Sequence, residues 1–65
     1  MEDALSFAYA VLKAIEGRIE LTEQNILQGA PDNMEKYRQL VGELEGLQYA
    51  RTEIRERLDR LEKEE

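Results

Sequence analysis

The chain has 65 residues, with 15 acidic side chains against 9 basic ones, and it contains no cysteine and no histidine. These features exclude disulfide bridges, the usual zinc and haem sites, and catalytic groups of the Ser-His-Asp or Cys-His kind. The formal net charge of −6 argues against nucleic-acid binding, because such proteins usually carry a basic excess or stripe. We therefore expect no enzyme, no cofactor, no metal ion and no small-molecule substrate.

A chain of this length forms one domain at most, which we place at 1–65. Folding alone would bury only about 60% of the surface that the unfolded chain exposes. Small domains usually gain the missing stability from disulfides, metals or oligomerisation. Since the composition removes the first two, association with further helices is the remaining route.

The first predicted helix covers 3–28. Apolar side chains recur there at alternating steps of three and four, which is the heptad spacing of helices that pack together. The positions of this seam are Leu5, Ala8, Leu12, Ile15, Ile19, Thr22 and Ile26.

A turn is predicted at 28–32. Gly29 suits the left-handed residue that ends a helix. Pro31 cannot continue that helix, and it favours an extended conformation at Ala30. Asp32 then offers an N-cap for the next helix, with Glu35 three residues later as the second member of a capping box.

The second predicted helix covers 33–63, and its heptad seam contains one charged residue, Arg51. That side chain either extends to solvent or pairs with an acid of another helix, and it could fix the register. Acid-before-base pairs four residues apart support the last turns as a solvated face. The full seam is Tyr37, Leu40, Leu44, Leu47, Arg51, Ile54, Leu58 and Leu61.

So short a turn makes the two helices antiparallel neighbours, and the fold class is an all-α, two-helix hairpin. Folding about the turn predicts that Leu5 lies near Glu56 and Leu12 near Tyr49. It also places Ile15 near Gly46 and Ile19 near Gly42.

Gly42, Gly46 and Ala50 form a smooth stripe on the second helix. A glycine inside a helix costs about 1 kcal/mol relative to alanine, so two of them indicate a steric need. We expect close packing of this stripe against the first helix. The alternative is a groove that receives a partner's side chain.

The first helix is apolar beyond its seam, and a single hairpin cannot cover all of that surface. We expect self-association here, most simply as a four-helix bundle of two hairpins, with capture by another helical protein as the alternative. The expected interface residues are Ala4, Phe7, Ala8, Val11, Leu12, Ala14 and Ile15, with Val41 and Tyr49 from the second helix.

Two other groups of side chains have both a structural and a functional interpretation. Glu16, Glu20 and Glu23 share a helix face, and a solvated acidic stripe is favoured over a carboxylate metal site because no histidine can complete one. Tyr9, Tyr37 and Tyr49 are aromatic residues that could act as interface hot spots, although packing at the edge of the core is commoner.

The stretch from Lys36 to Leu47, with Tyr37, Gly42 and Gly46 at its characteristic spacing, resembles small helical proteins encoded by tailed bacteriophages. The resemblance covers 36–61, and it implies a phage or prophage origin and a role in particle assembly, without catalytic residues. The architecture is also similar to the Rop-type RNA-binding hairpin dimer, although no matching motif or basic stripe is present.

The expected function is therefore that of a non-enzymatic, oligomeric structural or assembly protein, whose partner is a second copy or another helical protein. The alternatives are an acidic module that inhibits a host protein and a Rop-like RNA binder. The acidic start of the chain and the shortness of its longest apolar run, 7–12, predict a cytoplasmic protein of a bacterium or infected host, or a virion component, with no membrane span.

Overall fold

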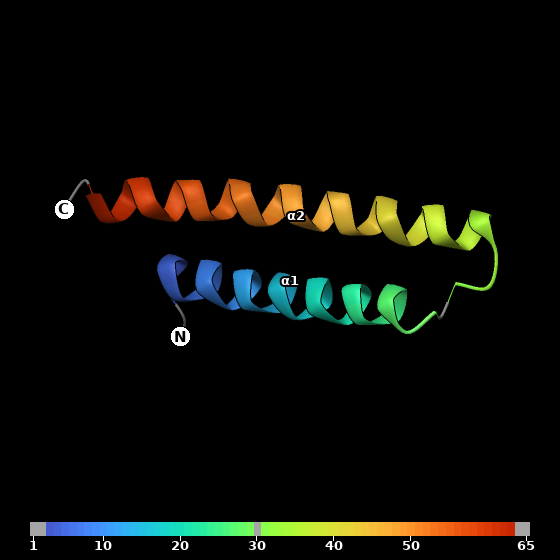
Figure 1. The fold of residues 1–65 in the computed structure, drawn as a ribbon. Helices are drawn as coiled ribbons and strands as arrows, with labels where there is room; N and C mark the ends of the chain where they lie inside the picture. Colours follow the sequence, from blue (N-terminus) through green and yellow to red (C-terminus); the bar gives the residue numbers. More distant parts are fainter. Residues whose placement is uncertain (1–2, 30, 64–65) are drawn as a thin grey trace.

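The computed structural model describes residues 3–29 and 31–63, and it shows a helical hairpin. Helix α1 (Ala4–Leu27) and helix α2 (Met34–Lys63) run antiparallel side by side, so that the start of α1 and the end of α2 lie at the same end of the hairpin (Figure 1). No strand occurs in either described range. The molecule measures 49 × 22 × 14 Å. The all-helical class and the two helices were predicted correctly, each to within one residue at either end.

The ends of α1 are closed by local hydrogen bonds. The Asp3 carboxylate accepts a hydrogen bond of 2.7 Å from the backbone N–H of Ser6, and so acts as the N-cap. At the other end, Gly29 has a φ of +76°, a left-handed conformation that glycine adopts without steric cost. The predicted helix stop at Gly29 is confirmed, whereas the expectation for Ala30 lies outside the described residues.

The start of α2 corrects the predicted cap. The backbone N–H of Lys36 donates to the side-chain oxygen of Asn33 at 2.8 Å, so Asn33 is the N-cap. Asp32 instead forms an ion pair of 3.4 Å with the Lys36 ammonium group. The predicted capping box of Asp32 and Glu35 is therefore wrong. Asparagine and aspartate cap helices about equally well, so residue type alone does not choose between these neighbours.

The core is a single line of contact between the two helices. Leu12 and Ile19 of α1 and Leu58 of α2 are its buried hydrophobic side chains, and Thr22 is buried beside them. All four are positions of the predicted heptad seams. A core this narrow is what two helices alone can form, since each buries only one stripe of its surface.

The predicted register is wrong for the seam residues. Leu5 lines a hollow with Leu58 and Leu61. Leu12 likewise shares a hollow with Leu58. The connection does not reverse the chain directly, because α2 begins beyond the last turn of α1 (Figure 1). As a result, Leu5 and Leu12 of the α1 seam lie beside Leu58 of the α2 seam.

Candidate association surface

One side of the hairpin is marked by an ion pair between the helices. Arg18 of α1 lies 2.7 Å from the carboxylate of Glu43 of α2, and its Nε donates to the same oxygen at 2.8 Å. Side chains that lie at steps of three and four from these two residues, and that do not belong to the seams, are on the same side. We name this side the Phe7 flank: Ala4, Phe7, Val11, Ala14, Arg18 and Leu21 of α1, with Glu43, Gly46, Ala50, Glu53 and Arg57 of α2.

The opposite side is marked by two further contacts between the helices. Arg55 of α2 pairs with Glu16 of α1, and the hydroxyl of Tyr9 donates to Glu62. We name this side the Glu16 flank: Tyr9, Lys13, Glu16, Glu20, Glu23 and Leu27 of α1, with Arg38, Val41, Glu45, Gln48, Thr52, Arg55, Asp59 and Glu62 of α2.

The α1 part of the Phe7 flank is apolar and open. The side chain of Phe7 is 61% exposed and that of Leu21 is 46% exposed. Ala14 is exposed and Val11 is half-buried between them. Apolar side chains that follow one another along a helix without a covering partner are typical of an interaction surface.

The carboxylates of the Phe7 flank are already paired. Glu43 is held by Arg18, and Glu53 accepts a hydrogen bond of 2.7 Å from Arg57 one turn later. That hydrogen bond from Arg57 to Glu53 raises the pKa of the guanidinium above its ordinary value. The flank therefore presents small and apolar groups between neutralised ion pairs.

The Glu16 flank has a different character, because its acids outnumber its bases. Arg55 pairs with Glu16, and Lys63 pairs with Asp59 one turn earlier. Three other acids of the flank form no ion pair within the described residues: Glu20, Glu23 and Glu45. Two large hydrophobic side chains stand on it separately, Tyr9 at 43% and Leu27 at 85% exposure. Scattered hydrophobic residues on a charged surface are normal and need no partner.

The nine residues expected at an interface divide among different surroundings. Leu12 is buried within the hairpin, and Ala8 and Ile15 lie partly covered in the same seam. Val41 falls on the Glu16 flank, and Tyr49, 69% exposed, lies on the side of α2 that faces away from α1. The four that gather on one surface are Ala4, Phe7, Val11 and Ala14.

The stripe Gly42, Gly46 and Ala50 does not pack closely within the hairpin. A Cβ atom added at Gly42 or Gly46 would meet nothing within 4 Å. The expected contact with Ile15 and Ile19 is therefore wrong for the single hairpin. Gly42 and Gly46 each lie two residues from the seam position Leu44, about 200° around the helix, and so face away from the seam. Gly46 lies on the Phe7 flank instead, with open space above it.

Two polar side chains occupy the seams. The hydroxyl of Thr22 is buried, with the residue 1% exposed, and it has no hydrogen-bond partner. Its heptad position was visible in the sequence, but its lack of a partner was not. Arg51 is half-buried and makes no hydrogen bond or ion pair within 3–29 and 31–63, which agrees with extension to solvent rather than pairing inside the hairpin.

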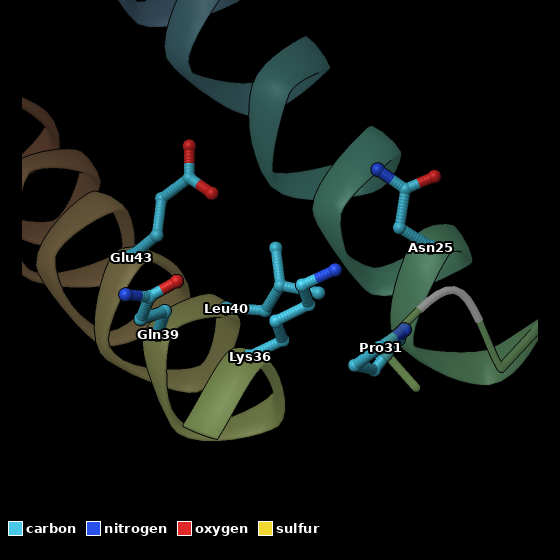
Figure 2. Close-up of a pocket in the computed structure, with 6 residues that line it drawn as sticks. All are labelled: Asn25, Pro31, Lys36, Gln39, Leu40 and Glu43. Carbon is cyan, nitrogen blue, oxygen red and sulfur yellow. The ribbon is translucent and has the colours of Figure 1, made fainter. Parts of the chain in front are cut away.

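A hollow of about 400 Å³ lies beside the turn, lined by Pro31, Leu40 and polar side chains of both helices (Figure 2). Its two charged groups already have partners, since Lys36 pairs with Asp32 and Glu43 pairs with Arg18. Figure 2 shows Asn25 reaching in from α1 opposite the α2 side chains.

The described residues form neither a metal-binding cluster nor a membrane-spanning helix. No three acidic side chains come together there in a way that could hold a metal ion, the Glu16, Glu20 and Glu23 stripe included. Neither α1 nor α2 contains a stretch long and apolar enough to cross a bilayer.

Comparison with known proteins adds no relative: no family model matches the chain, and neither a curated protein nor a solved structure is significantly similar to it.

Proposed function

We propose that the chain is a non-enzymatic building block that functions by associating with itself through its helices. The observation that carries this proposal is its accessible surface of 5240 Å². A folded monomer of 7.6 kDa is expected to expose about 4,300 Å². The excess of about 900 Å² is close to the roughly 800 Å² that each partner buries in a typical stable interface.

The small core supports the same proposal. Within 3–29 and 31–63, three hydrophobic side chains are buried, whereas large apolar side chains such as Phe7, Leu21 and Tyr49 remain exposed. Pairing two hairpins into a four-helix bundle would cover part of this surface and complete a core that each hairpin only begins. Together with the resemblance of 36–61 to phage proteins, this favours a structural or assembly role in a phage or prophage.

A second candidate, an acidic module that binds a host protein, is favoured by one observation, the acidic excess of the Glu16 flank. Such a surface would attract a basic cleft, and its binding would weaken steeply with salt. A pull-down from bacterial lysate at low and high salt tests it. A stoichiometric, salt-sensitive partner would support this candidate, and recovery of none would remove it.

Light scattering on the purified chain, with its helix content measured on the same sample, tests the proposed self-association. We expect a particle of at least twice 7.6 kDa at micromolar concentration. A fully helical particle of one chain would contradict the proposal.

A further inference from the structure

We propose that the Phe7 flank docks onto the Phe7 flank of a second copy of this chain, so that α1 of each copy lies against α2 of the other. This inference rests on the proposed self-association and assigns it a surface and an arrangement. The nine interface residues expected from the sequence do not lie on one surface. The ion pairs between the helices, Arg18 with Glu43 and Arg55 with Glu16, distinguish the two sides of the hairpin and so define the surface.

The chemistry of the two flanks selects the surface. On the Phe7 flank, apolar side chains follow one another from Phe7 to Ala14, and Leu21 lies one turn beyond Arg18. Glu43 and Glu53 are neutralised by arginines. Covering this flank would remove apolar area from water without leaving a carboxylate unpaired. Covering the Glu16 flank would instead bury acids such as Glu20 that form no ion pair within the described residues.

The charges also indicate that the occupant is a second copy. Two Glu16 flanks brought together would oppose acid with acid, which is destabilising. Two Phe7 flanks carry both signs in paired form, so an identical surface meets no net repulsion there. A symmetric dimer needs such a self-complementary patch, since the same residues face each other across the axis.

The sizes of the side chains set the arrangement. On the Phe7 flank the large apolar side chains belong to α1, whereas α2 contributes the small Gly46 and Ala50. Glu23 of α1 and Leu44 of α2 line one hollow. Because the helices are antiparallel, Leu21 and Gly46 each lie two residues further from the turn than this pair, so they sit near the same height along the hairpin. A two-fold axis along the hairpin preserves height and sets Leu21 of one copy over Gly46 of the other.

The space above Gly46 fits that arrangement. Nothing lies within 4 Å of the position that a Cβ atom would take at this residue, so a leucine side chain from another helix can approach the backbone. Small residues opposite large ones allow helices to interdigitate at native packing density. The cost of a mid-helix glycine then has a steric reason that the single hairpin does not supply.

Paired substitutions on the two flanks test the surface. Phe7→Gln and Tyr9→Gln each replace an exposed aromatic residue in the same turns of α1, but on opposite flanks, and a glutamine at position 9 keeps a donor for Glu62. Leu21→Glu and Leu27→Glu form a second pair of the same kind. We expect the Phe7 and Leu21 variants to weaken the dimer at least about 30-fold, since they place a polar or charged side chain within the apolar surface that docking covers. The Tyr9 and Leu27 variants should keep the wild-type dissociation constant.

Sedimentation equilibrium over a range of concentrations gives these constants. Equal weakening by both members of a pair, or dimers that persist in all four variants, would overturn the assigned surface while self-association itself stands. A wild-type chain that stays monomeric and folded would overturn both the surface and the proposed function.

Cross-linking tests the arrangement with substitutions that keep the fold, because the chain has no cysteine of its own. Leu21→Cys and Gly46→Cys are prepared separately, distinguished by mass, mixed and oxidised gently. We expect the mixed disulfide to exceed either like-with-like disulfide. Preferential like-with-like products, or no cross-link between dimeric variants, would overturn the pairing of α1 with α2.

Discussion

The two flanks of this hairpin are built on the same pair of helices and the same seam, yet they differ in what they expose. The Phe7 flank presents apolar side chains of α1 beside small residues of α2, between ion pairs that are already formed. The Glu16 flank presents an excess of acids with isolated hydrophobic residues among them. Exposed hydrophobic residues occur on both, and so exposure alone does not identify a docking surface. A docking surface is identified by apolar side chains that adjoin one another and by neighbouring charges that are already paired.

The largest expected effect comes from the seam that both flanks share. Leu58 is 5% exposed and packs against the α1 seam, so Leu58→Ala should destabilise the protein by about 2–5 kcal/mol. Leu61→Ala, one turn later at a residue 54% exposed, is the matched control and should cost much less. Urea unfolding followed by helix content measures both variants. Similar losses would show that the described core does not hold the hairpin together.

The two ion pairs between the helices provide the sharpest comparison of the flanks. Arg18 and Arg55 are similarly exposed in the single hairpin, with side-chain values of 51% and 60%. Arg55→Gln should cost at most about 1 kcal/mol, because an exposed pair is screened by water and salt. Arg18→Gln should cost at least about 1 kcal/mol more, since docking on the Phe7 flank would leave Glu43 partly desolvated.

Urea unfolding of both arginine variants at low and high salt gives this difference. Equal effects of the two substitutions would mean that water reaches both flanks alike, against the assigned surface.

Thr22→Val removes the buried hydroxyl that lacks a partner. We expect a gain in stability of about 1 kcal/mol, because valine keeps the shape of the side chain without a desolvated polar group. Thr52→Val, at an exposed position of the Glu16 flank, should change the stability by less than about 0.5 kcal/mol. Thermal melts of both variants measure the difference. A loss of stability on Thr22→Val would indicate that the hydroxyl is satisfied in solution.

The smallest expected effect is on the pH dependence of stability, through the Asp3 cap at the start of α1, the helix that both flanks share. The backbone N–H of Ser6 donates to Asp3 and lowers the pKa of that carboxyl below its ordinary value. A lowered pKa in the folded state adds stability above the unfolded value, and this stability is lost as the pH falls through the folded value.

Asp3→Asn keeps a capping side chain that does not titrate. The advantage of the wild type over this variant should therefore shrink below about pH 4, measured as the difference in Tm across an acid series. A difference that does not change with pH would contradict the role of the charged cap.

Much of the fold follows from local chemistry that the sequence displays. The heptad seams placed both helices, and Gly29 with Pro31 placed the turn, because these signals act over a few residues. The cap at Asn33 was missed because Asp32 is an equally good candidate next to it. The register was missed because it depends on the path of the connection and on seam-to-seam packing, which sequence spacing does not specify.

The residues of the Phe7 flank could be predicted only in part, because local patterns are visible in the sequence and the register between the helices is not. The apolar excess of α1 is visible as a pattern, so Ala4, Phe7, Val11 and Ala14 could be selected. Their relation to Gly46 could not, since it follows from the register and from the ion pair of Arg18 with Glu43. Heptad spacing alone also grouped the buried Leu12 with residues that remain exposed.

The central claim is that folding of the hairpin is coupled to its association, and the dependence of Tm on protein concentration tests it most directly. For a dimer that unfolds to separate chains, mass action requires the Tm to rise with concentration. We expect a clear rise in Tm, followed by circular dichroism, over a roughly hundredfold increase in concentration. A Tm that stays the same across that range would show that one hairpin folds and remains stable alone, and would contradict the account.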